Sequence, residues 1–208
     1  MTKTPVHVGL IGSQFISTIH AKALQSCQDA ELLAVASPTP GNAQTFASEF
    51  SIPHHFTDYH QMLELSDLDM VVIGAPNHLH CEMTVAAAAA GKHVVCEKPL
   101  CLNLAEADQM IEACKVAGVK LMYAEELCFA PKYVRLKQLL DSGALGAPTL
   151  IKQSEKHSGP HAPHFWDVEK SGGGVAMDMG CHAIEFFRWM LGRPAIKSVY
   201  AQMNTLVH

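Results

Sequence analysis

The sequence has few charged residues and no cluster of basic ones. Charged side chains make up 17% of the 208 residues, and the formal net charge is −5 at pH 7. A nucleic-acid partner requires a basic surface that neutralises phosphates. We therefore expect no nucleic acid among the partners of this protein.

Paired cysteines are also lacking. Seven cysteines are scattered at irregular spacings, and none belongs to a Cys-x-x-Cys pair. An odd number of cysteines at such spacings argues against a disulfide framework. The pattern therefore predicts a reducing, cytoplasmic environment.

Long apolar segments are absent as well. The longest uniformly apolar stretch, residues 85–90, is far too short to cross a bilayer. Near the N-terminus, His7 and Gln14 interrupt the apolar stretch and no small-residue cleavage site follows, so we predict no signal peptide. We expect no membrane association. The 49% of hydrophobic residues is instead typical of a globular protein with a buried core.

Short apolar runs alternate with helix-length segments through the first 125 residues. The strands expected from these runs cover residues 6–11, 32–36, 70–73, 93–96 and 121–124. The helices expected between them include residues 20–24, 42–50, 82–90 and 105–117. Continuously apolar strands are typical of a parallel sheet that is covered on both faces. We predict an α/β fold in which residues 1–125 form a Rossmann domain with a doubly wound parallel sheet.

The pattern changes after about residue 125. We expect a helix at 131–142, a strand at 149–154, a longer helix at 175–191 and a strand at 196–207. The chain stops within that last strand, and its backbone groups need a partner from an earlier strand or from another chain. The pattern indicates either a truncated product or such a pairing, and it predicts a second domain at residues 126–208.

The turn after the first strand has part of a dinucleotide-binding motif. Gly12 occupies the first glycine position of Gly-x-Gly-x-x-Gly, whereas Gln14 and Ser17 replace the second and third glycines. Backbone N–H groups at such a turn and at the following helix start can hold a pyrophosphate. The residues expected to do so are Gly12, Gln14, Phe15 and Ile16. The alternative is a plain turn between a strand and a helix.

Further candidates lie after the next two strands. Ser37 follows the second strand, where neither the usual acidic residue nor a nearby arginine is present, so the cofactor can be NAD or NADP. Pro76, Asn77 and His80 follow the strand at 70–73, and ligands of such sheets bind at the carboxyl ends of the strands. The alternatives are a turn role for Asn77 and an ordinary helix-start role for His80.

Glu97-Lys98-Pro99 follows the expected strand at 93–96. A lysine between a carboxylate and a proline of fixed φ is held in one orientation. We interpret Lys98 as a positioned catalytic group and place Glu97 and Lys98 at the cofactor edge of the sheet. The alternative is a salt bridge at the strand end followed by a turn.

A glycine-led segment carries the second catalytic candidate. Asp178 and His182 are four residues apart on an expected helix, so both side chains should project from one face. The three glycines at 172–174 allow the backbone to approach a ligand closely. A purely structural pair at this spacing is the alternative.

Together these motifs resemble the Gfo/Idh/MocA family, named after glucose-fructose oxidoreductase, inositol dehydrogenase and rhizopine catabolism. The likeness runs from about residue 6 to the end of the chain. It is carried by the stretches DMVVI (69–73), PNHLH (76–80), GKHVVCEKP (91–99) and GGGVAMDMGCH (172–182).

The resemblance implies an NAD(P)-dependent oxidoreductase that acts on a secondary hydroxyl group of a sugar or polyol. It implies that Lys98, Asp178 and His182 form the catalytic group. His182 would be the acid/base, Asp178 would orient its imidazole or hold a substrate hydroxyl, and Lys98 would polarise the reacting oxygen. It also implies that residues 126–208 are the incomplete beginning of an α+β substrate domain. A homo-oligomer in the full-length form is implied as well, because the second domain of this family often forms the oligomer contact.

Two other functions remain open from the sequence. One is a redox-neutral, NAD-dependent glycosidase or lyase, as in some relatives of this family. The other is a non-catalytic nucleotide-binding fragment, which the altered glycine motif and the short length would fit.

A segment rich in histidine precedes the three glycines. We predict that its aromatic and imidazole side chains contact the substrate; they are His157, His161, His164 and Trp166. An ordinary solvated loop and a metal site are the alternatives. The segment has no zinc-finger spacing and no cysteine partner nearby, so we predict no metal site.

Overall fold

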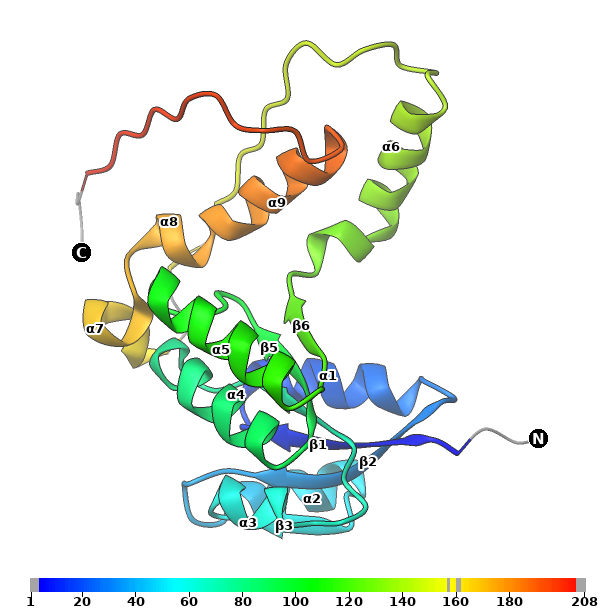
Figure 1. The fold of residues 1–208 in the computed structure, drawn as a ribbon, viewed down its shortest axis with the longest axis vertical. Coiled ribbons are helices and arrows are strands. Elements are labelled where there is room, and N and C mark those ends of the chain that lie inside the picture. Colours follow the sequence, from blue (N-terminus) through cyan, green and yellow to red (C-terminus); the bar gives the residue numbers. More distant parts are fainter. Residues whose placement is uncertain (1–3, 157, 160–161, 205–208) are drawn as a thin grey trace. The chain divides into compact units, whose positions relative to one another are not determined.

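The structure is a computed structural model that describes residues 4–156, 158–159 and 162–204 (Figure 1). The chain divides into two compact units, Met1–Ala124 and Glu125–His208, called unit 1 and unit 2 below.

Unit 1 is built on a six-stranded sheet in which every neighbouring pair of strands is parallel. The strand order is β3-β2-β1-β4-β5-β6. The strands are β1 (Val6–Ile11), β2 (Ala30–Ala36), β3 (His54–Phe56), β4 (Met70–Ile73), β5 (His93–Glu97) and β6 (Leu121–Ala124). From β1 to β3 each new strand is added on one side of β1, and from β4 to β6 on the other side. Rossmann domains bind dinucleotides at this change in strand order, between β1 and β4. The predicted α/β fold with a doubly wound parallel sheet is confirmed.

Helices cover both faces of this sheet. The helices are α1 (Phe15–Gln25), α2 (Asn42–Phe50), α3 (Tyr59–Leu63), η1 (Asn77–Leu79), α4 (His80–Ala89) and α5 (Leu104–Val116). Successive strand residues point to opposite faces, so Leu10 packs with residues of α1 and α2 whereas Ile11 packs with residues of α3, α4 and α5. Figure 1 shows α4 and α5 side by side. The apolar cores on the two faces of the sheet hold the carboxyl ends of the strands in place.

Sequence patterns missed β3 and α3. The strand has only three residues, two of them histidines, and it pairs with β2 alone at the edge of the sheet. Such a short edge strand has no apolar run to reveal it. Asp58 caps α3 by accepting a hydrogen bond from the His60 amide, 2.9 Å away.

In the described residues of unit 2, all the regular secondary structure is helical. Its helices are η2 (Leu127–Phe129), α6 (Pro131–Asp141), η3 (Pro163–Trp166), α7 (Val168–Ser171), α8 (Val175–Asp178) and α9 (Gly180–Met190). The strand predictions at 149–154 and 196–207 are wrong for the described parts of those ranges, which pair with no strand. An apolar run forms a strand only when its backbone groups find a partner. Within the part of the chain that the structure describes, no helix is long and apolar enough to span a membrane.

The single helix predicted at 175–191 is also wrong. Met179 interrupts it, so that Asp178 is the last residue of α8 and His182 lies in the first turn of α9. The His182 amide donates to the Met179 carbonyl at 3.2 Å. Gly180, directly after the break, is a poor helix former. The i,i+4 argument that placed Asp178 and His182 on one helical face therefore does not hold.

Candidate active site

The turn from β1 to α1 is tightly packed against the turn that follows β4. Gly12 has a φ of +112°, and a Cβ atom added to it would lie 2.5 Å from the Gly74 carbonyl oxygen. A Cβ on Gly74 would lie 3.0 Å from the Ser17 hydroxyl. Ser17, at the third position of the altered motif, is buried. Position 17 carries a serine where the usual motif has a glycine. The two turns still approach each other closely, because Gly74 has no side chain.

The start of α1 leaves backbone donors uncapped. Gln14 is the N-cap residue, has an extended backbone and makes no capping hydrogen bond through its side chain. Gln14 and Phe15 are exposed and Ile16 is half-buried. The first N–H groups of a helix have no partner within the helix and suit an anion. The altered motif therefore keeps the features that a pyrophosphate requires, namely a side-chain-free Gly12 and an open helix N-terminus.

A pair of hydroxyl groups lies after β2, where the usual acidic residue is missing. The Ser13 hydroxyl donates to the Ser37 hydroxyl at 2.9 Å, and Ser37 is buried. Ser37 is also held by its backbone, because its amide donates to the Phe56 carbonyl at 3.0 Å. Hydroxyl groups can donate to or accept from a ribose, and this pair carries no charge that would select NAD over NADP.

His80 connects two neighbouring loops through its ring nitrogens. Its ring is fully buried, with Nδ1 2.9 Å from the Pro99 carbonyl oxygen and Nε2 2.8 Å from the Ala75 carbonyl oxygen. Burial lowers the pKa of His80, which favours the neutral ring. Asn77 is buried beside Pro76. Cofactor contact by Pro76, Asn77 and His80 stays a prediction, and the geometry gives His80 a second role in tying the Ala75 loop to the Lys98-Pro99 loop.

Lys98 follows the last residue of β5. Glu97, which is buried, accepts a hydrogen bond from the Lys98 amide through Oε2 at 3.0 Å. Its Oε1 lies 2.7 Å from His20 Nε2, on α1. The carboxylate therefore fixes the backbone at Lys98 and links it to the helix of the predicted pyrophosphate site. The sequence reading missed His20, although its place on the first helix of a nucleotide-binding pattern was a possible signal.

In unit 2, His182 is paired with Glu125. His182 Nδ1 lies 2.5 Å from Glu125 Oε1, and both side chains are buried. Asp178 is half-buried at the end of α8. Glu125 was also missed, and its position immediately after the apolar run at 121–124 was the only sequence signal for it.

Glu126 is the third acidic or imidazole group here. It is exposed, with Oε2 3.8 Å from His182 Nδ1. Glu125, Glu126 and His182 offer ligand atoms within 4.8 Å of one another, which is close enough to hold a metal ion. Nδ1 of His182 is already hydrogen-bonded to the nearer carboxylate, that of Glu125.

Part of the predicted substrate segment can be placed. His164 and Trp166 lie in η3; the His164 ring contacts the Phe165 ring at 4.3 Å between centroids, and Trp166 is 52% exposed. His157 and His161 lie outside the described residues. Substrate contact by all four stays a prediction.

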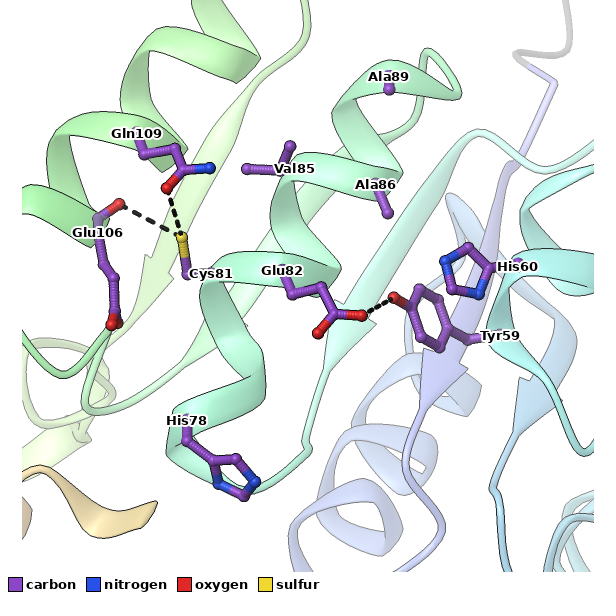
Figure 2. Close-up of a pocket in the computed structure, with 10 residues that line it drawn as sticks. All are labelled: Tyr59, His60, His78, Cys81, Glu82, Val85, Ala86, Ala89, Glu106 and Gln109. Carbon is purple, nitrogen blue, oxygen red and sulfur yellow. Dashed lines mark hydrogen bonds between the residues drawn. The ribbon is translucent and has the colours of Figure 1, made fainter. Parts of the chain in front are cut away.

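A pocket of about 520 Å³ lies elsewhere on unit 1 (Figure 2). Its lining residues come from α3, η1, α4 and α5 and are Tyr59, His60, His78, Cys81, Glu82, Val85, Ala86, Ala89, Glu106 and Gln109. The Tyr59 hydroxyl donates to Glu82 Oε1 at 3.1 Å, and burial together with this bond raises the pKa of Tyr59 to about 12. None of the predicted cofactor or catalytic residues belongs to this lining, so we do not assign the pocket to the predicted site.

Comparison with known proteins identifies related sequences. Residues 6–125 match the model of the Gfo/Idh/MocA oxidoreductase family with an NAD-binding Rossmann fold, and residues 133–208 match the model of the Gfo/Idh/MocA C-terminal domain. The chain is 31% identical over 202 residues to myo-inositol 2-dehydrogenase of Thermotoga maritima, covering 97% of this chain and 59% of that protein. It is 32% identical over 204 residues to D-glucoside 3-dehydrogenase of Escherichia coli, covering 97% of this chain and 58% of that protein.

Solved structures show the same likeness. The crystal structure of GenD2 from gentamicin A biosynthesis in complex with NAD superimposes with a TM-score of 0.84 and 28% identity, over 94% of this chain and 56% of that one. The chain thus spans a little under three fifths of the length of the relatives it matches.

Proposed function

The chain belongs to the Gfo/Idh/MocA family of oxidoreductases and has its NAD-binding Rossmann domain, and we propose that it transfers a hydride between NAD or NADP and a secondary hydroxyl group of a sugar or polyol. The observation that carries the proposal is Lys98 at the carboxyl end of β5, with its amide fixed by the buried Glu97 carboxylate. Inositol and glucoside dehydrogenases among the relatives support the substrate class.

The proposed cofactor contacts come from three loops of unit 1. The backbone of Gly12, Gln14, Phe15 and Ile16 would hold the pyrophosphate at the start of α1. Ser37 would contact the adenine ribose, and the contacts nearer the nicotinamide would come from Pro76, Asn77, His80, Glu97 and Lys98. A bound nicotinamide supplies the acceptor or donor of the hydride. The Gly12–Gly74 contact shows that this turn requires a glycine, because the Gly74 carbonyl occupies the space that a Cβ atom on Gly12 would need.

The proposed proton chemistry belongs to Lys98, Asp178 and His182. Nε2 of His182 would take the proton from the substrate hydroxyl, since Nδ1 faces Glu125. The Lys98 ammonium would stabilise the negative charge that develops on the substrate oxygen. Of the two roles predicted for Asp178, holding a neighbouring substrate hydroxyl is the better supported, because Glu125 already orients the imidazole.

The remaining proposals concern the whole protein. We propose that residues 126–208 begin the substrate domain and that His157, His161, His164 and Trp166 contact the sugar or polyol. The scattered cysteines without a Cys-x-x-Cys pair support a cytoplasmic location. The family resemblance supports a homo-oligomer in the full-length form.

The test is a screen for cofactor reduction. The purified chain is mixed with NAD or NADP and with a panel of inositols, aldoses and alkyl glucosides, and absorbance is followed at the band of reduced nicotinamide. We expect net reduction with at least one polyol or sugar and one cofactor form. Product formation without net reduction would instead favour a redox-neutral lyase or glycosidase. Failure to bind either nucleotide would contradict the proposal, and binding of a nucleotide without turnover on any member of the panel would favour a non-catalytic nucleotide-binding fragment.

A further inference from the structure

The Glu125–His182 pair is the most deeply buried pair of ionisable side chains in the described part of unit 2. Side-chain exposure is 3% for Glu125 and 6% for His182, and the two residues are 57 positions apart in the sequence. Glu125 directly follows β6, whereas His182 lies in the first turn of α9. A buried carboxylate is costly unless hydrogen-bond donors surround it, so the surroundings of Glu125 indicate what it does.

Two donors and one imidazole nitrogen approach the Glu125 carboxylate. His182 Nδ1 and the Leu127 amide approach Oε1 at 2.5 Å and 3.5 Å. The Cys128 thiol approaches Oε2 at 4.0 Å. Burial raises the pKa of Cys128 to about 11, which keeps that group a neutral S–H donor. An ionised carboxylate can only accept hydrogen bonds, so a group that bonds to it must donate.

A hydrogen-bond acceptor beside Nδ1 determines which of the two ring nitrogens of His182 carries the proton. A neutral imidazole has one N–H group, and an ionised carboxylate partner requires that group to be Nδ1–H. Nε2 then has a free lone pair. Within the described residues, no hydrogen bond to Nε2 competes for it.

We propose that Glu125 is a positioning residue that fixes the Nδ1–H tautomer of His182 and so presents the Nε2 lone pair to the substrate hydroxyl. This inference rests on the proposed function. In the step, the substrate O–H bond breaks and its proton moves to Nε2. The C–H bond breaks with its electron pair leaving as hydride to the nicotinamide, and a C=O bond forms. The resulting imidazolium is stabilised by the Glu125 carboxylate, in the manner of a general base supported by a buried acid.

The test reads the tautomer directly. The chain is labelled with ¹⁵N-histidine, and long-range ¹H–¹⁵N correlation spectra are recorded at a pH where the imidazole is neutral. The chain has 13 histidines, and His182→Gln identifies the His182 signals. We expect the protonated nitrogen to be Nδ1. A proton on Nε2 would overturn the proposal, because it would mean that Glu125 itself donates to Nδ1.

Two variants distinguish the effect of the Glu125 carboxylate on the tautomer from the effect of the nearby Glu126 carboxylate. Glu125→Gln keeps the shape but can present an amide donor to Nδ1, so we expect it to lose the Nδ1–H preference. Glu126→Gln removes the exposed carboxylate 3.8 Å from Nδ1 and should leave the tautomer unchanged. Persistence of Nδ1–H in Glu125→Gln would overturn the proposal. Should Glu125→Gln fail to fold, as seen by circular dichroism, the wild-type tautomer still decides.

Kinetics separate this inference from the proposed function. With a substrate from the panel, Glu125→Gln should lower kcat by about 100-fold with little change in KM, since general-base catalysis contributes about 10²–10⁴-fold. Glu126→Gln should retain kcat. A wild-type chain that shows the Nδ1–H tautomer but no hydride transfer would refute the function alone. Hydride transfer together with an Nε2–H tautomer would refute the inference alone.

Discussion

The two units bury their apolar side chains to different extents. Among the described residues of unit 2, only Phe186 and Met190 are buried apolar side chains, whereas unit 1 buries apolar residues on both faces of its sheet. Unit 2 also exposes large apolar groups such as Tyr200, at 89%. Burial of apolar surface is the main source of folding free energy. Unit 1 therefore has a core that can hold a nucleotide site rigid, and unit 2 depends on a few contacts and on its buried Glu125–His182 pair.

The strongest effect expected in unit 1 comes from Gly12→Ala. The backbone conformation at Gly12 and the contact with the Gly74 carbonyl exclude a side chain. We expect a loss of stability of about 1–3 kcal/mol from the strained conformation. Because the same turn forms the proposed pyrophosphate site, nucleotide affinity should fall by at least about tenfold, or about 1.4 kcal/mol.

Thermal unfolding and isothermal titration calorimetry with NAD measure both effects. Gly41→Ala is the matched control, since Gly41 also has a positive φ but has no atom within 4 Å of an added Cβ. Gly41→Ala should lose stability and keep affinity. Equal loss of nucleotide affinity in the two variants would contradict the assignment of this turn.

The next effect, on stability alone, is expected at His20. His20→Ala removes the imidazole from the buried Glu97 carboxylate, and an unsatisfied buried group costs about 1–3 kcal/mol. His20→Gln retains a donor and should recover part of that loss. Chemical denaturation compares the variants, and identical stabilities of wild type and His20→Ala would show that this hydrogen bond does not hold the Lys98 loop.

Sequence reasoning worked where local patterns decide the structure. The apolar runs of β1, β4 and β5 are largely buried in the sheet, and such runs show directly in the sequence. Sequence reasoning failed where the structure of a segment depends on a partner that is distant in the sequence. The runs at 149–154 and 196–207 have the composition of strands, but a strand forms only with a neighbour, and no composition reveals whether that neighbour is present.

The site follows the same rule. Lys98 and the Gly12 turn could be found because strand ends mark the ligand edge of a parallel sheet. Glu125 could not be recognised as the partner of His182, because their contact joins residues far apart in sequence. The break before Gly180 also escaped, since an apolar pattern with helical period does not show where one helix ends and the next begins.

The smallest effect is expected for Tyr200→Ser in unit 2. Tyr200 is almost fully exposed in this chain, and exposed positions without specific contacts change stability by no more than about 0.5 kcal/mol. Denaturation of the variant should overlay that of the wild type. A loss above about 1 kcal/mol would show that unit 2 has a larger core than the contrast with unit 1 implies.

The central claim is that Lys98 takes part in hydride transfer, and steady-state reduction of NAD or NADP by the Lys98→Met variant tests it most directly. Met keeps much of the side-chain length and removes the charge. We predict that turnover falls by about 10²–10³-fold, as when an electrostatic stabiliser of the transition state is removed, while circular dichroism and the unfolding midpoint stay unchanged. Turnover within about twofold of the wild type, with an intact fold, would contradict the account.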